Sequence, residues 1–278
     1  MADQLELAKR FRALHEASEP FVIPNVWDGG SAAVMAGLGF KALATSSSAC
    51  AATLGRTDGG ITRAQALAHC QLLASVSPVP VAADLENGFG DAPEMVAQTI
   101  RLAGETGIVG GSIEDSRSDE REPIYPFTQA VERVTAAVQA ARALPFPFVL
   151  TARAENFLWG RGDLDETLRR LQAFEAAGAD VLFAPGLPDL AAVRAVCSAV
   201  SRPVNFMVGM PGQSFSVAEL AAAGVGRISL STTLYRAAMT GLMTAAREVQ
   251  ASGSFKYLQG LIGGGELGGY LRQLNRGD

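Results

Sequence analysis

The sequence predicts a (β/α)₈ barrel, an α/β fold in which eight parallel strands alternate with helices. Eight short runs of β-branched and apolar residues recur between longer segments rich in Ala, Leu and Arg, and a closed barrel needs eight strands. Several of the longer segments end in glycine just before the next apolar run, which suits a left-handed helix cap and a tight turn. A chain of 278 residues also fits one barrel.

The predicted strands follow one another at regular intervals along the chain. They are residues 21–26, 41–45, 79–84, 108–114, 146–153, 180–184, 203–208 and 226–231. Glycine precedes the strand in GLGFKALAT, GETGIVGGSIED, EAAGADVLFA and AAAGVGRISLS. Hydrophobic spacing in residues 167–177 and 216–223 suits helices that pack on a sheet through one face. Repeated helix–turn–strand units of this kind indicate parallel strands.

The barrel is predicted to occupy residues 1–233, and residues 234–278 to form a C-terminal helical extension of the same domain. No Pro/Ser-rich linker divides the chain, and its GxG-like pieces lack the spacing of a dinucleotide-binding fingerprint. The extension is longer than one closing helix requires and is interrupted at Gly253 and at residues 263–265. We therefore expect it to leave the barrel and to mediate homo-oligomerisation.

Composition and charge exclude several classes of partner. A net charge of −5 without a run of Lys or Arg gives no reason to expect a nucleic acid or an anionic membrane. No stretch of 18 apolar residues occurs, so no membrane span is expected. The first segment lacks the apolar core of a secretion signal, and three cysteines without a CxxC pair fit a reducing cytoplasm. Small anionic substrates remain as partners.

Polar residues at the carboxyl ends of the predicted strands are the candidates for a site, because active sites of such barrels lie there. This criterion selects Asn25, Trp27, Asp28, Thr45, Ser46, Ser47, Ser48, Asp84, Glu86, Asn87, Glu114, Asp115, Arg153, Glu155 and Asn205.

An acidic cluster stands out among these candidates. Asp84 and Glu86 are two residues apart in a segment expected to be extended, so their side chains can point the same way, and Glu114 ends the adjacent strand. Like charges this close need a cation, and oxygen ligands without His or Cys suit Mg²⁺ or Mn²⁺ rather than zinc. The alternative is that these acids are loop residues paired with Arg153 and Arg117.

Arg153 and the serine run Ser46–Ser47–Ser48 could bind an anion. Arg153 closes an otherwise apolar strand, where its guanidinium could bind a substrate carboxylate in a bidentate manner. An internal salt bridge to Glu155 or Glu114 is the other interpretation, and the two are compatible. The serines offer hydroxyl and N–H groups to a carboxylate, although the same run also fits an ordinary loop.

Nucleophilic mechanisms find little support. The two histidines, His15 and His69, fall in helical segments, so a Ser-His-Asp arrangement has no base. Lys41 opens its strand at the wrong end for a Schiff base, and Lys9 and Lys256 lie on no predicted strand. Cys50 follows the second strand and fits a buried structural thiol.

Six motifs in order along residues 20–240 together resemble the isocitrate lyase and phosphoenolpyruvate mutase superfamily. They are FVIPNVWDGGSA, TSSSACAATLGRTD, PVAADLENGFG, GSIEDS, TARAEN and GVGRISLSTTLYRAA. The resemblance implies a barrel whose last helix is exchanged with a neighbouring subunit, giving a homotetramer of swapped pairs. It also implies Mg²⁺ chelated by a pyruvate-like moiety and catalysis through an enolate that the metal stabilises.

The resemblance assigns roles residue by residue. It implies Asp84 as the principal metal-associated aspartate, with Glu86, Glu114 and Asp58 in the surrounding shell, mostly through water. Ser46 and Ser47 match the loop that holds the substrate carboxylate, and Trp27 and Asp28 match the strand-one contacts. Arg153 matches the substrate arginine and Asn205 a strand-seven contact. Asp58, Glu114 and Arg153 are the resulting candidates for catalysis.

One departure from the family concerns the gating loop after the fourth strand. The family's lyases carry Lys-Cys-Gly-His there and its phosphonate mutases a Lys and an Asn, whereas this chain reads SRSDEREPIYPF. Arg117, Arg121 and Tyr125 are the residues that could close over the site instead. The family's usual proton donor is therefore missing.

Three functions are left open by this departure. The first is a Mg²⁺-dependent lyase that cleaves or decarboxylates a carbon–carbon bond of a small 2-oxo or 2-hydroxy di- or tricarboxylic acid of the isocitrate, methylisocitrate or oxaloacetate type. The second is a phosphonopyruvate- or carboxyphosphonate-type phosphomutase or hydrolase. The third is a protein that binds a 2-oxo acid with little turnover.

Overall fold

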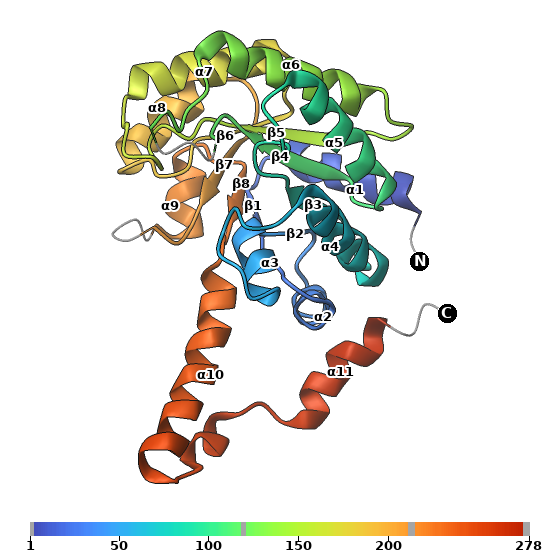
Figure 1. Ribbon diagram of the computed structural model, residues 1–278, viewed down its shortest axis with the longest axis vertical. Coiled ribbons are helices and arrows are strands. Elements are labelled where there is room, and N and C mark those ends of the chain that lie inside the picture. The colour runs from blue at the N-terminus through green and yellow to red at the C-terminus, as the bar shows by residue number, and fades with distance from the viewer. Residues whose placement is uncertain (1–2, 118–120, 211–214, 275–278) are drawn as a thin grey trace.

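Eight parallel strands form a barrel with helices around it (Figure 1). The computed structural model of the protein describes residues 3–117, 121–210 and 215–274. The strands are β1 Phe21–Ile23, β2 Leu43–Ala44, β3 Val81–Asp84, β4 Gly110–Glu114, β5 Val149–Arg153, β6 Val181–Phe183, β7 Val204–Met207 and β8 Arg227–Ser229. Each lies inside one of the runs predicted from the sequence, so the predicted fold class is confirmed.

The strands pair in chain order, and β1 also pairs with β8. Between β1 and β2 the barrel closes through a parallel bridge from Asn25 to Ala44, where the Val26 N–H donates to the Ala44 carbonyl at 2.8 Å. All carboxyl ends therefore meet at one mouth. Gly178 and Gly224, which precede β6 and β8, have φ of 102° and 92°, so the glycine-led turns predicted from the sequence are confirmed there.

The helices that alternate with the strands have well-defined ends. They are α1 Gln4–Glu16, α2 Gly29–Gly37, α3 Ser47–Thr53, α4 Arg63–Val76, α5 Pro93–Glu105, α6 Phe127–Arg142, α7 Leu164–Ala176, α8 Leu190–Ala199, α9 Val217–Ala222, α10 Thr233–Ser252, the 3₁₀ helix η1 Lys256–Gly260 and α11 Gly264–Leu274. Side chains cap many of them, as Asp189 does for α8 by accepting from the Ala192 N–H. None of the described helices combines the length and the apolar character needed to cross a membrane.

Helix α1 packs on the inner residues of the barrel at the end opposite the mouth. Its Leu7, Ala8 and Phe11 form one apolar cluster with residues of six strands or their flanks, among them Phe21 and Val181. Gly110 makes room for this contact, because a Cβ there would lie 2.7 Å from the Phe11 ring. Helix α1 therefore covers this end of the barrel mainly with apolar side chains.

Beyond β8 the chain leaves the barrel. Helix α10 extends away from it, and α11 turns back toward α2 (Figure 1). None of the residues of α10 is buried. Large exposed apolar side chains gather in this segment, namely Leu242, Met243, Val249, Phe255, Leu258, Leu261, Ile262, Leu267 and Leu271. An apolar surface of this extent favours contact with another protein surface.

His15 on α1 is a neutral histidine held between the apolar cluster and β8. Its Nδ1 lies 2.8 Å from the Phe11 carbonyl, and its Nε2 lies 3.2 Å from Nη1 of Arg227. Nδ1 therefore carries the proton and Nε2 accepts from the guanidinium. Burial, and then the charge of Arg227, lower the pKa of His15 to about 3.

Acid sensitivity should follow from this depressed pKa of His15. The unfolded chain binds a proton near pH 6.5 and the folded chain near pH 3, so stability is lost as the pH falls below 6.5. The loss from this residue at pH 5 should be about 2 kcal/mol. Urea unfolding at pH 7.5 and pH 5 should show that His15→Gln, which cannot be protonated, loses that much less than the wild type. An equal loss in both proteins would contradict the assignment.

Candidate active site

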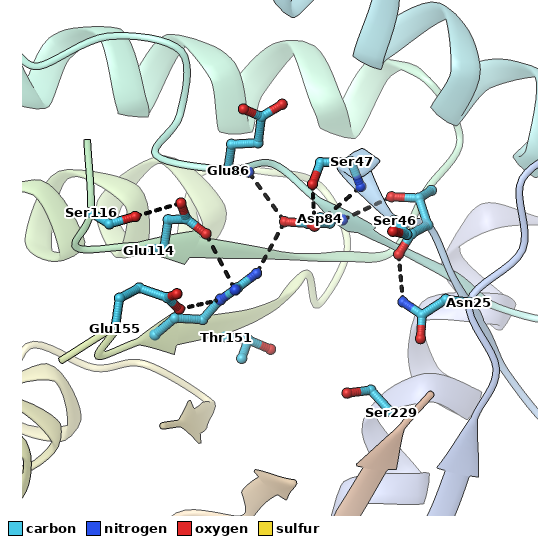
Figure 2. A network of polar contacts seen from close by, with 12 residues as sticks. Asn25, Ser46, Ser47, Asp84, Glu86, Glu114, Ser116, Thr151, Glu155 and Ser229 are labelled. Carbon is cyan, nitrogen blue, oxygen red and sulfur yellow. Dashed lines mark hydrogen bonds and ion pairs between the residues drawn. The ribbon is translucent and has the colours of Figure 1, made fainter. Parts of the chain in front are cut away.

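Three carboxylates, which Figure 2 labels as Asp84, Glu114 and Glu155, contact Arg153 at the mouth of the barrel. Its Nη1 lies 3.2 Å from Oδ1 of Asp84, its Nη2 3.3 Å from Oε2 of Glu114 and its Nε 2.7 Å from Oε1 of Glu155. Asp84, Glu114 and Arg153 are the last residues of β3, β4 and β5. The parallel pairing of these neighbouring strands explains why they meet. We call Asp84, Glu86, Glu114 and Glu155 the acidic wall.

Burial and neighbouring charges have opposite effects on the pKa values of Arg153 and Glu114. Burial lowers the pKa of Arg153, but the charges of Glu155, Glu114 and Asp84 outweigh it and hold that pKa above its ordinary value. Burial raises the pKa of Glu114 above its ordinary value, and the charge of Arg153 only partly offsets this. Arg153 is therefore an internal ion-pair partner, one of the two interpretations left open by the sequence.

The segment Ser46–Ser47–Ser48, called the serine loop below, contacts Asp84. Ser47 donates its backbone N–H to Oδ2 of Asp84 at 3.2 Å, and its hydroxyl lies 2.9 Å from that oxygen and 3.2 Å from Oδ1 of Asp58. Ser46 caps α3 by accepting from the Ala49 N–H. Burial, and then the charge of Asp84, raise the pKa of Asp58. The structure thus brings Ser46, Ser47, Asp58 and Asp84 together.

Glu86 does not lie as the spacing predicted. Strand β3 ends at Asp84, and Glu86 has a φ of 49°, so the segment turns instead of continuing extended. The Glu86 N–H lies 3.3 Å from Oδ1 of Asp84, while its carboxylate points away from Asp84 (Figure 2). The expected parallel orientation of the two side chains is wrong, because a turn closed by the Gly88 N–H and the Leu85 carbonyl follows the strand.

A divalent cation fits the acidic wall only with water as part of its shell. Among the described residues, no three His, Cys, Asp or Glu side chains are arranged to hold a metal together. Oε1 of Glu86 is buried without a hydrogen-bond partner in the described part of the chain. Burial, and then the charge of Asp84, raise the pKa of Glu86 to about 8. Oxygen donors with surplus negative charge suit Mg²⁺, which usually keeps several waters.

The cavity wall opposite the acidic wall is polar and includes the positively charged side chain of Arg227. Asn205 on β7 accepts from Nε of Arg227 at 2.8 Å and donates to Oγ of Ser229 at 3.0 Å. Nη2 of Arg227 donates to Oγ1 of Thr151 at 2.9 Å. The sequence criterion missed Arg227 because it selected strand ends and Arg227 opens β8. Arg227 and Ser229 are two residues apart in the predicted strand, so their side chains should face the same side of it. This spacing is the sequence signal that could have identified Arg227.

Two candidates lie outside the cavity. Asp28 caps α2, where its carboxylate accepts from the Ser31 N–H at 2.7 Å. The ring of Trp27 packs edge-on against Tyr235 with centroids 5.4 Å apart. Neither is among the residues that line the cavity in the described part of the chain. The turn after β1 leads directly into α2, so local capping takes Asp28 away from the site.

The gating loop is described only in part, since residues 118–120 lie outside the described residues. Arg117 lines the cavity and forms an ion pair with Glu122. Tyr125 is fully buried, and its hydroxyl donates to Oδ1 of Asp91 at 2.6 Å. Three loop residues were named from the sequence. Tyr125 is held in the protein interior by Asp91, and neither Tyr125 nor Arg121 is among the residues that line the cavity.

Both walls enclose a cavity of about 790 Å³. This volume is ample for a small carboxylic acid together with a hydrated ion. Its rim includes apolar side chains, namely Leu158, Trp159, Phe183, Met207 and Met210. A barrel mouth with an acidic wall, a serine loop and a polar far wall is typical of the active site of a barrel enzyme, the class of protein that the fold and the site indicate.

Comparisons with known proteins agree with this class. The family model described as phosphoenolpyruvate phosphomutase matches residues 11–250. A crystal structure of a Burkholderia cenocepacia J2315 protein, provisionally described as a lyase/mutase, is 50% identical, with a TM-score of 0.94 and 96% of each chain covered.

Two curated relatives have named activities. 2-Methylisocitrate lyase of Escherichia coli (strain K12) is 29% identical, over 82% of this chain and 79% of the relative. Oxaloacetate decarboxylase of Paraburkholderia xenovorans (strain LB400) is 29% identical, over 91% of this chain and 85% of the relative. The chain belongs to the isocitrate lyase and phosphoenolpyruvate mutase superfamily, as its motifs predicted. These relatives support a carbon–carbon lyase, and the mutases belong to the same superfamily.

Proposed function

We propose that the protein is a lyase dependent on Mg²⁺ or Mn²⁺ that cleaves or decarboxylates a small 2-oxo or 2-hydroxy di- or tricarboxylate of the isocitrate, methylisocitrate or oxaloacetate type. The observation that carries this proposal is the acidic wall, where, within the described part of the chain, Arg153 is the one cation paired with Asp84, Glu114 and Glu155. Asp84 would anchor the ion, with Glu86, Glu114 and Asp58 acting through water. When bound, the ion supplies Lewis-acid stabilisation of the enolate that carbon–carbon cleavage produces.

The chain's own residues bind the substrate and handle its protons. The Ser46–Ser47 loop offers the substrate carboxylate hydroxyl groups at the start of α3. Arg153 fixes the positions of the acids around it, and Asn205 presents its amide from β7. Glu114, which accepts from the Ser116 hydroxyl at 2.7 Å, has a raised pKa. Glu114 and Asp58 are therefore candidates to hold a proton where the family's loop residues are missing.

A substrate panel tests the reaction class. With Mg²⁺, isocitrate, methylisocitrate, dimethylmalate or oxaloacetate should release pyruvate or glyoxylate, and EDTA should abolish the release. Phosphonopyruvate should yield neither phosphoenolpyruvate nor phosphate. Formation of either from phosphonopyruvate alone would favour the phosphomutase or hydrolase, the activity that the family model's description supports. Metal-dependent thermal stabilisation by 2-oxo acids without turnover would favour a binding protein.

The C-terminal segment is proposed to exchange between subunits. Its support is the exposed apolar surface of residues 242–271 and the absence of buried side chains in α10. Light scattering after gel filtration should find a homo-oligomer, a tetramer of swapped pairs, that Leu261→Asp dissociates into smaller species. Leu72→Asp, at an exposed leucine on α4, should leave the mass unchanged. A wild type that is monomeric would refute the exchange.

A further inference from the structure

Arg227 differs from Arg153 in the charge of its partners. Its three nitrogens contact Asn205, Thr151 and His15, all of which are neutral at pH 7. Among the described residues, no carboxylate lies within ion-pair distance of Arg227, although the residue is only 6% exposed. An isolated buried cation is unfavourable unless an anion reaches it.

The ionisation of Arg227 reflects this isolation. Burial, and then the charge of Arg153, lower the pKa of Arg227 to about 9, so the guanidinium remains charged near neutral pH. His15 cannot compensate it, because its ring is neutral. Arg227 is therefore positively charged. Its partners among the described residues form hydrogen bonds with it, but none of them is negatively charged.

The cavity that contains the acidic wall also extends to Arg227. Several small side chains are among its lining residues, namely Ala44, Ala82, Ser112, Thr151 and Ser229. Thr151 and Ser229 lie on the side of the site away from Glu86 and Ser47 (Figure 2). Arg227 contacts Thr151 and therefore lies on that side of the cavity.

We propose that Arg227 forms an anion subsite that selects substrates carrying a second carboxylate, distant from the end held at the acidic wall. Arg153 cannot serve this purpose as well, since each of its three nitrogens already contacts a carboxylate. The inference rests on the proposed function for the carboxylic-acid class of ligand. It adds the residue that distinguishes a dicarboxylate from an acid with a neutral tail.

A matched pair of ligands tests the subsite. L-malate and 2-hydroxybutyrate are both 2-hydroxy acids of four carbons and differ in a carboxylate or a methyl group at the far end. Isothermal titration calorimetry, with and without Mg²⁺, should show that the wild type binds malate at least about tenfold more tightly. Arg227→Gln should weaken malate about 30-fold or more and 2-hydroxybutyrate less than about threefold. Arg227→Lys, which keeps the charge, should retain part of the preference.

Arg101→Gln is the control, because Arg101 is an exposed arginine on α5 that is not among the residues lining the cavity. It should change the affinity for each ligand less than about threefold. Equal weakening of both ligands by Arg227→Gln would show that Arg227 only orients Asn205, and would overturn the inference. So would a wild type without preference for malate, a result that needs no folded variant. A malate preference that depends on Arg227 in a protein without turnover would overturn the proposed function and leave the subsite standing.

Discussion

Asp84→Asn is expected to lower kcat/KM by about 10³-fold or more without unfolding the barrel. The asparagine keeps the shape of the side chain and an oxygen that can accept from Ser47, but it removes the charge proposed to hold the ion. Alanine would also remove the partner of Arg153 and the acceptor for Ser47, so its effect on stability would confuse the result. Steady-state kinetics at saturating Mg²⁺, with a urea titration beside it, measures both quantities.

Asp189→Asn is the matched control for this substitution. Asp189 caps α8 outside the cavity, and asparagine caps a helix about as well as aspartate. Its kcat/KM and its unfolding midpoint should equal those of the wild type. Metal-dependent turnover that survived Asp84→Asn would refute the assignment of Asp84.

Arg153→Met should reduce the free energy of unfolding by about 3–5 kcal/mol, because it leaves Asp84, Glu114 and Glu155 facing one another without their cation. Adding Glu155→Gln to this variant should restore part of the loss, since it removes one of the repelling charges. Urea unfolding of the single and double variants measures both effects.

Arg142→Met provides the comparison for Arg153. Arg142 bonds to Asp180 at 2.7 Å, but its side chain is 43% exposed. Solvent screens such a pair, so its loss should be about 1 kcal/mol or less. If Arg153→Met were no more destabilising than Arg142→Met, the acidic wall would not depend on its arginine.

The strands could be predicted because each apolar run lies between polar or glycine-containing turns. Asp84, Glu114 and Arg153 could be placed at one mouth because parallel strands bring their carboxyl ends together. The sequence could not show which acids pair with Arg153. Its contacts connect three strand ends, and the distances between these ends depend on how the barrel closes. Glu86 was misplaced because nothing in its two-residue spacing from Asp84 shows that β3 ends before it.

Helix capping explains why one residue expected at the site lies elsewhere. Asp28 was expected at the site from its place after β1, but it precedes a helix and Ser31 stands at the position of a capping box. Arg227 was overlooked because it opens β8, whereas the criterion selected strand ends. Its two-residue spacing from Ser229 could have shown that it faces inward, but the absence of carboxylates around it in the described part of the chain is a property of the folded interior.

Titration with Mn²⁺ tests whether Asp84 anchors a divalent ion at the acidic wall. Electron paramagnetic resonance of free Mn²⁺, in the presence of oxalate as a chelating acid, counts bound ions without requiring turnover. We expect about one Mn²⁺ per wild-type chain and an affinity about 100-fold weaker for Asp84→Asn. A wild type that binds no Mn²⁺, or a variant that binds it equally well, would refute the metal site at Asp84.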